Sequence, residues 1–123
     1  MTNSTNTISP SDKILVSIID HVAQLTINNP PANTWDLESL SALTVTVNRL
    51  NADPAISALV IHGQGEKFFS AGADLKQFET GDKDISSQVA LRFGEAFEAL
   101  TNFKGVSIAA INGYAMGGGL ECA

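Results

Sequence analysis

Alternating β-branched and polar residues mark the first regular stretch of the chain. The alternation runs over residues 14–19 and again over 22–27, with Asp20 and His21 between the two runs. Alternation of this kind indicates half-buried strands, and the short connection indicates a hairpin. The ladder cannot continue through 28–31, because the prolines there lack an N–H donor and restrict the residues before them. The pattern predicts a fold that opens with a β-hairpin.

Helical spacing replaces the alternation after these prolines. Leucine and valine recur at helical spacing from Leu37 to Leu50, and the β-branched run 44–47 falls inside this pattern. Asn33 and Thr34 are candidate N-caps, and the acidic residues of the first turn suit the positive end of the helix dipole. We therefore predict a helix over this stretch.

Two later apolar runs, 56–62 and 106–111, are rich in branched residues and typical of strands that a parallel sheet covers on both faces. Between them lie a glycine-containing loop and two helical patterns, at 63–72, 75–78 and 87–102. The longer helix is expected to place Val89, Phe93, Phe97 and Leu100 on one apolar face, with Ser86 or Ser87 as its cap. Alternation of strands and helices predicts an α/β fold.

The length of 123 residues allows one domain. Residues 1–13 are rich in Ser, Thr and Asn, with neither a basic start nor an apolar stretch, so we interpret them as a disordered leader and not as a secretory signal. Residues 14–123 then form the domain. The glycines at 117–119 begin a helical turn that stops at Ala123, which predicts that the sequence is the N-terminal part of a longer domain.

The charge balance narrows the possible partners. There are 7 Lys and Arg against 13 Asp and Glu, a net charge of −6, so the chain lacks the positive field that nucleic acids or anionic lipids attract. Its apolar runs fall far short of the ~20 residues that span a membrane. The single cysteine cannot form an internal disulfide, which favours a reducing, cytoplasmic setting. Neither His21 nor His62 has a second ligand at metal spacing, so no metal site is expected.

A glycine-rich turn near residue 118 has the features of an anion site. Gly117, Gly118 and Gly119 lie between an apolar strand and a helix start, where free N–H groups and the helix dipole favour negative charge. For a helix that starts around Gly118, Glu121 follows within one turn and suits acid–base chemistry beside a developing oxyanion. The alternative is a close-packed glycine turn with an ordinary first-turn glutamate. Cys122 is interpreted as a small buried side chain.

The run 68–76 is a second candidate site. Its small residues at 70–73 follow a predicted strand and allow a backbone N–H to point into a cleft at the carboxyl ends of the strands. Lys76 is placed to meet a phosphate. The alternative is a surface loop in which Asp74 caps a helix.

These two segments together carry a resemblance to a known family. They read FFSAGADLKQF over 68–78 and AAINGYAMGGGLECA over 109–123, and they resemble the two signature stretches of the enoyl-CoA hydratase/isomerase family, the crotonase superfamily. The hairpin, the helix from Leu37 and the strand ALVIHG (58–63) come in the order that the family shows. The resemblance implies the N-terminal half of a crotonase-like ββα spiral, an α/β fold.

The resemblance also implies roles for individual residues. The family holds the carbonyl oxygen of an acyl-CoA thioester between two backbone N–H groups, an oxyanion hole that falls here on Ala73 and Gly118. The first catalytic glutamate falls on Glu121, and a second glutamate would lie beyond Ala123. Trp35 replaces a smaller residue of many members, and it either packs against the sheet or shapes the acyl channel. The residues implied to cradle coenzyme A are Ala71, Ala73, Asp74, Leu75, Lys76 and Gly118.

The function implied is hydration of a 2-enoyl-CoA, as in fatty-acid β-oxidation, with coenzyme A as part of the substrate and no separate cofactor. An enoyl-CoA isomerase, another acyl-CoA dehydratase and a non-catalytic acyl-CoA-binding fragment stay open as alternatives. A serine protease built on Ser70 is disfavoured, because the sequence has neither a G-x-S-x-G elbow nor a positioned histidine. The family further implies a homotrimer or homohexamer.

Overall fold

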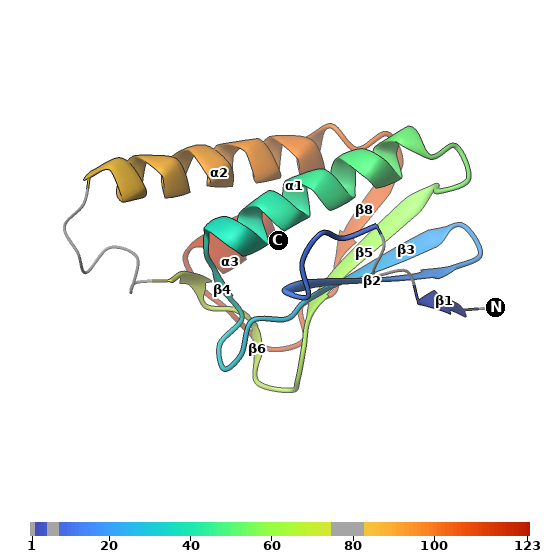
Figure 1. The fold of residues 1–123 in the computed structure, drawn as a ribbon. Coiled ribbons are helices and arrows are strands. Elements are labelled where there is room, and N and C mark those ends of the chain that lie inside the picture. The colour runs from blue at the N-terminus through green and yellow to red at the C-terminus, as the bar shows by residue number, and fades with distance from the viewer. Residues whose placement is uncertain (1, 5–7, 75–82) are drawn as a thin grey trace.

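A computed structural model describes residues 2–4, 8–74 and 83–123, which form a five-stranded sheet with two long helices side by side over one face (Figure 1). The elements in chain order are β1 (Thr2–Ser4), β2 (Ile14–Ile19), β3 (Val22–Ile27), β4 (Thr34–Trp35), α1 (Leu37–Ala52), β5 (Ala58–Gly63), β6 (Phe68–Ser70), β7 (Gly72–Ala73), α2 (Lys83–Thr101), β8 (Val106–Ala109), β9 (Tyr114–Ala115) and α3 (Gly118–Cys122). The sheet has the order β1-β2-β3-β5-β8, and two short pairs, β4 with β7 and β6 with β9, accompany it.

The hairpin forms as the alternation predicts. β2 and β3 pair antiparallel from Ile14 opposite Ile27 to Ile19 opposite Val22. Asp20 takes a left-handed conformation in the turn, with φ of 55°, which short polar side chains adopt more readily than most. Alternation places one face of both strands in the hydrophobic core.

The N-terminal segment differs from the disordered leader that its composition predicts. Thr2–Ser4 forms β1, which pairs antiparallel with the free edge of β2. Further along, Ser9 is buried, and the Ser11 hydroxyl donates to Glu38 of α1 (Oγ to Oε2, 2.5 Å). Composition did not reveal these contacts, because an open strand edge offers backbone groups that pair with an extended segment of almost any sequence.

The parallel part of the sheet consists of β3, β5 and β8. Leu59 of β5 lies opposite Ser107 of β8, and both face the side covered by the helices. Val106 and Ile108 point to the other face and are 61% and 49% exposed. The prediction that this strand is covered on both faces is therefore wrong, because the described residues supply helices to one face only.

Each strand of the two short pairs comes after the carboxyl end of one of the three parallel strands. β4 follows β3, β6 and β7 follow β5, and β9 follows β8. Asn112 ties two of these connections together, because its Nδ2 donates to the carbonyl oxygens of Gly63 (2.8 Å) and Gly65 (2.9 Å) and its Oδ1 accepts the Gly63 N–H (2.9 Å). In open α/β sheets the carboxyl ends of the strands are where ligands bind.

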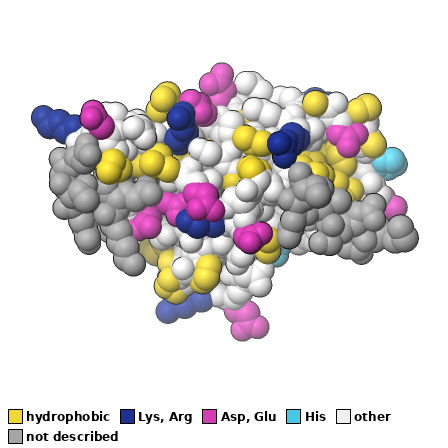
Figure 2. Space-filling model, in the orientation of Figure 1, with side chains coloured by type: hydrophobic (Ala, Val, Ile, Leu, Met, Phe, Trp, Pro, Cys, Tyr) yellow, Lys and Arg dark blue, Asp and Glu magenta, His cyan; other side chains and the backbone are white. Residues whose placement is uncertain are grey.

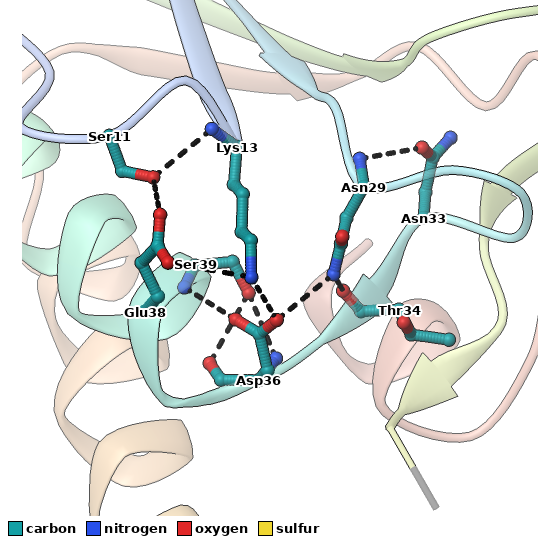
Figure 3. A network of polar contacts seen from close by, with 8 residues as sticks. All are labelled: Ser11, Lys13, Asn29, Asn33, Thr34, Asp36, Glu38 and Ser39. Atoms are coloured by element: carbon teal, nitrogen blue, oxygen red, sulfur yellow. Dashed lines mark hydrogen bonds and ion pairs between the residues drawn. The ribbon is translucent and has the colours of Figure 1, made fainter. Parts of the chain in front are cut away.

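The N-cap of α1 is Asp36, not Asn33 or Thr34. Asp36 Oδ1 accepts the Ser39 N–H (2.8 Å), and Ser39 Oγ accepts the Asp36 N–H (2.9 Å), which completes a reciprocal capping box (Figure 3). Thr34 belongs instead to β4, and Asn33 leads into that strand with φ of 52°. The sequence could not separate these candidates, since each polar residue type is a common cap.

Asp36 also accepts bonds from outside the helix. Lys13 Nζ lies 2.5 Å from its Oδ2, and Asn29 Nδ2 donates to the same oxygen at 3.2 Å (Figure 3). Burial raises the pKa of Asp36, but the hydrogen bonds from Lys13 and Ser39 and the charge of Lys13 together hold it below its ordinary value. The carboxylate is therefore the favoured form in the folded protein.

Replacing Asp36 with Asn is expected to lower the free energy of unfolding at pH 7 by about 1 kcal/mol, because Asn still caps the helix but loses the charge-assisted bonds. The lowered pKa means that this stabilisation is present above about pH 4 and is lost as the pH falls through the folded value. Urea unfolding of both proteins at pH 7 and about pH 3 measures the effect. The control is Glu38→Gln, an exposed partner of Lys13. An equal difference between Asp36→Asn and the unsubstituted protein at both pH values contradicts the assignment.

The inner face of α2 agrees with the prediction, but its start does not. Val89 is buried, and Phe93 packs against the core. Ser86 and Ser87 both lie within the helix, so neither is its N-cap. The helical piece predicted at 75–78 lies outside the described residues.

The surface carries mixed side chains. On the face shown in Figure 2, hydrophobic, acidic and basic groups are interspersed, and the basic groups lie apart from one another. Among the described residues, most of the large apolar side chains that are exposed belong to the C-terminal segment, namely Val106, Ile108, Ile111, Tyr114, Met116 and Leu120. Across the ranges that the structure describes, no helix is both long and apolar enough to cross a membrane.

Candidate functional site

A hollow of about 310 Å³ brings together three segments that are distant in the sequence. It is lined by Ala73 of β7, Ala90 and Phe93 of α2, and Gly118 and Glu121 of α3. The two residues predicted to donate N–H groups to a carbonyl oxygen therefore border the same space as the predicted catalytic glutamate.

The start of α3 leaves a backbone donor for this space. Gly118 is the first residue of the helix, so its N–H has no carbonyl partner within the helix. Gly117 is the N-cap with φ of 50°, a conformation that L side chains rarely adopt. The Glu121 N–H donates to the Gly117 carbonyl oxygen (3.0 Å) and closes the turn. The predicted helix start at Gly118, with Glu121 one turn further on, is confirmed.

Two other glycines allow the segment 116–119 to pack closely against the segment 70–72. A Cβ at Gly119 would lie 2.1 Å from the carbonyl oxygen of Ser70, and a Cβ at Gly72 would lie 2.9 Å from that of Met116. Any side chain at these positions would push the loops apart. The close-packed glycine turn considered as an alternative thus describes Gly119, whereas Gly118 borders the hollow.

Ala73 lies in β7, which pairs parallel with β4. The next residue, Asp74, donates its N–H to the Trp35 carbonyl oxygen (2.8 Å) across this pair. Because successive N–H groups of a strand point to opposite sides, the Ala73 N–H is directed away from β4. The strand pair therefore leaves this donor for another acceptor.

The residues implied to cradle coenzyme A are only partly described. The Ala71 N–H donates to the Ala32 carbonyl oxygen (3.0 Å), and the Asp74 N–H is engaged with β4 as above. These two amides are used by the protein itself. Leu75 and Lys76 lie outside the described residues, so their roles stay predictions.

Trp35 and Cys122 have structural roles here. Trp35 has no exposed surface and lies in the hydrophobic core, as the packing interpretation predicts. Cys122 packs against the core, and its burial raises the pKa of its thiol to about 12. A thiol with this pKa stays protonated and weakly nucleophilic at neutral pH.

A second hollow, of about 350 Å³, lies between α1 and α2 and is lined by Thr44, Asn48, Glu95, Glu98, Ala99 and Asn102. None of the predicted site residues is among them. Its two carboxylates disfavour an anionic ligand such as a coenzyme A ester. Although it is slightly larger, it is the poorer candidate on chemical grounds.

Histidines do not contribute to the hollow. His62 Nε2 lies 2.9 Å from Thr26 Oγ1, and His21 Nδ1 lies 2.8 Å from the Ala55 carbonyl oxygen. Among the residues that the structure describes, no three His, Cys, Asp or Glu side chains are grouped to hold a metal ion.

Sequence reasoning missed the contribution of α2 to the hollow. Phe93 was expected on the inner face of that helix, and Ala90 lies three positions before it. The ring of Phe93 packs directly against Gly118. A Cβ added at Gly118 would lie only 2.8 Å from Cε1 of this ring. The only signal in the sequence was the apolar spacing, which indicates burial but not the element that is contacted.

Known proteins resemble this chain in sequence and in fold. Residues 17–123 match the family Enoyl-CoA hydratase/isomerase. A probable enoyl-CoA hydratase of Bacillus subtilis is 42% identical over 112 residues, which cover 89% of this chain and 43% of the relative. The structure of Pseudomonas aeruginosa DspI has a TM-score of 0.90 at 62% identity, over 92% of this chain and 46% of that chain. An enoyl-CoA hydratase from Geobacillus kaustophilus also has a TM-score of 0.90, at 27% identity, over 100% of this chain and 45% of that chain.

The chain therefore belongs to the enoyl-CoA hydratase/isomerase family, and its fold is the N-terminal part of the crotonase fold. It spans less than half the length of these relatives.

Proposed function

We propose that the protein containing this chain adds water across the double bond of a 2-enoyl-CoA thioester. The observation that carries the proposal is the hollow at which Ala73, Gly118 and Glu121 meet. Membership of the family and the enoyl-CoA hydratases among its relatives support an acyl-CoA ester as the substrate. Coenzyme A is then part of the substrate, and the reaction needs no separate cofactor.

The two backbone donors account for the electrophilic part of this reaction. Attack of water on the β-carbon moves electron density onto the thioester oxygen, which becomes an enolate-like oxyanion. N–H groups of Ala73 and Gly118 that are fixed by a strand and a helix start stabilise this charge without reorganisation.

Glu121 supplies one acid–base group. In the proposed reaction one carboxyl group takes a proton from the attacking water, and another delivers a proton to the α-carbon, so that one water molecule is added in full. Glu121 is exposed on α3 and borders the hollow. Among the described residues it is the one carboxylate in the lining, so we propose that its partner comes from outside these residues.

One carboxylate among the described residues lines the hollow, and such a site also suits a second function. An oxyanion hole with one acid can bind an acyl-CoA, or move its double bond, without adding water. Double-bond migration leaves the mass of the ester unchanged, whereas hydration adds one water. The two reactions and simple binding are therefore separable by product analysis.

The test is incubation of the purified whole protein with crotonyl-CoA and, separately, with 3-butenoyl-CoA, followed by liquid chromatography that resolves the two isomers and mass spectrometry of each ester. A product heavier by one water supports hydration. An isomer of unchanged mass, or tight binding of the ester with no product, contradicts hydration and selects the corresponding alternative.

A further inference from the structure

Ser70 is a buried polar residue between the two loops that border the hollow. Its side chain has no exposed surface. The hydroxyl donates to the Asn33 carbonyl oxygen (Oγ to O, 2.7 Å) and accepts the Gly72 N–H (3.2 Å). Both of its hydrogen-bonding directions are used inside the protein, so Ser70 is not placed to act as a nucleophile.

The backbone of Ser70 contacts the other loop. Its carbonyl oxygen accepts the Met116 N–H (3.0 Å), and the same oxygen is where a Cβ of Gly119 would collide. Gly72 directly precedes Ala73, and Met116 and Gly119 flank Gly118 at short range. One residue thus holds the chain on both sides of the hollow, through its hydroxyl on one side and its carbonyl on the other.

The acceptor of the Ser70 hydroxyl is itself held firmly. Asn33 is 1% exposed, and its Nδ2 donates to the carbonyl oxygens of Gln64 (3.1 Å) and Phe68 (3.0 Å). Its Oδ1 accepts the Asn29 N–H at 3.1 Å (Figure 3). The hydroxyl therefore connects the loop before Ala73 to a rigid neighbour and not to a mobile surface group.

We propose that Ser70 is a positioning residue that sets the placement of the Ala73 N–H relative to the Gly118 N–H. The inference rests on the proposed function, since it assumes that these two groups bind the thioester oxygen. Ser70 touches neither substrate nor reacting atoms and acts through Gly72. A donor that is displaced slightly binds the ground-state ester almost as well but stabilises the oxyanion poorly, so the effect falls on kcat more than on KM.

The test compares Ser70→Ala and Ser70→Cys with a matched control, Ser39→Ala, in the whole protein. Ser39 is also fully buried, and its hydroxyl likewise accepts one backbone N–H (2.9 Å) and donates to one carbonyl oxygen (3.2 Å), but it lies in the capping box of α1. The measurements are kcat and KM for crotonyl-CoA, the thermal midpoint, and the infrared carbonyl band of bound butyryl-CoA. This saturated ester cannot be hydrated, and its band shifts to lower frequency when both donors engage the oxygen.

Ser70→Ala is expected to lower kcat about 10- to 100-fold with KM changed by less than about twofold, and to move the carbonyl band toward its position in free butyryl-CoA. Ser70→Cys keeps a donor and acceptor at the same position in a larger and more weakly hydrogen-bonding group, so it is expected to fall between Ser and Ala and to test the idea even if the Ala variant does not fold. Ser39→Ala is expected to lower the thermal midpoint and to leave kcat and the band unchanged.

Two results overturn the inference and differ from each other. If the unsubstituted protein hydrates crotonyl-CoA and Ser70→Ala or Ser70→Cys keeps its kcat and carbonyl band, Ser70 has a structural role only, and the proposed function stands. If the unsubstituted protein neither hydrates crotonyl-CoA nor shifts the band of butyryl-CoA, the proposed function fails and the inference fails with it.

Discussion

Replacing Glu121 with Gln is expected to lower kcat for hydration of crotonyl-CoA by at least about a hundredfold, the usual lower range for a positioned acid–base group. Gln has nearly the same size and keeps hydrogen-bonding groups, but its amide neither takes nor gives a proton near neutral pH. The side chain is exposed on α3, so the substitution removes no core packing. Binding of butyryl-CoA, measured by calorimetry, is expected to persist.

The matched control for this prediction is Glu98→Gln. Glu98 is an exposed glutamate on α2 that lines the other hollow, so its substitution removes the same charge away from the predicted chemistry. Its kcat is expected to stay within about twofold of the starting value, as for a surface change remote from the site. Turnover by Glu121→Gln at the level of this control removes Glu121 from the reaction.

Replacing Gly118 with Pro is expected to lower kcat/KM by about 10²- to 10³-fold, the loss typical of one oxyanion-hole donor. Proline lacks the N–H, and it is well tolerated at the first position of a helix, which Gly118 occupies. Proline also restricts the residue before it, but this residue is Gly117, which has no Cβ to clash. The helix start is therefore expected to survive while the donor is lost.

Gly118→Ala separates the loss of the donor from crowding. A Cβ at this position lies 2.8 Å from Cε1 and 3.0 Å from Cζ of Phe93, and the proline ring brings the same Cβ. Alanine keeps the N–H, so its effect on kcat/KM reports the crowding alone. A Pro variant as active as the Ala variant shows that the Gly118 N–H does not act on the substrate.

The spacing of apolar residues predicted the strands and helices correctly where one face of the element packs against the core. The alternation over 14–19 and 22–27 gave the hairpin, and helical spacing overrode the β-branched run 44–47 inside α1. The N-cap of α1 was misplaced, because Asn33, Thr34 and Asp36 are all suitable cap residues. The reciprocal capping box with Ser39 distinguishes Asp36, and contacts with Lys13 and Asn29 hold its carboxylate in place.

The exposure of β8 shows a different limit. An apolar run reports that a strand is suited to burial, but it does not report what covers each face. Val106 and Ile108 are apolar and exposed among the described residues, whereas Leu59 on the neighbouring strand is fully buried. Which elements pack against each face of a strand depends on the whole fold and not on the local sequence.

The candidate site followed from the sequence through its glycines and its resemblance to a family. Glycines at 117–119 before a glutamate indicated a helix start beside an acid, and the resemblance added Ala73 as the second donor. Neither source pointed to Phe93 or to the hydroxyl of Ser70. Their roles arise from contacts between segments that lie far apart in the sequence, which no local spacing encodes.

The most direct test of the proposed oxyanion hole is a crystal structure of the whole protein with bound butyryl-CoA. The thioester oxygen is expected to lie about 2.7–3.1 Å from the backbone nitrogens of both Ala73 and Gly118, with the Glu121 carboxylate facing the carbon chain. A thioester oxygen bound away from these two nitrogens, for instance in the hollow between α1 and α2, contradicts it.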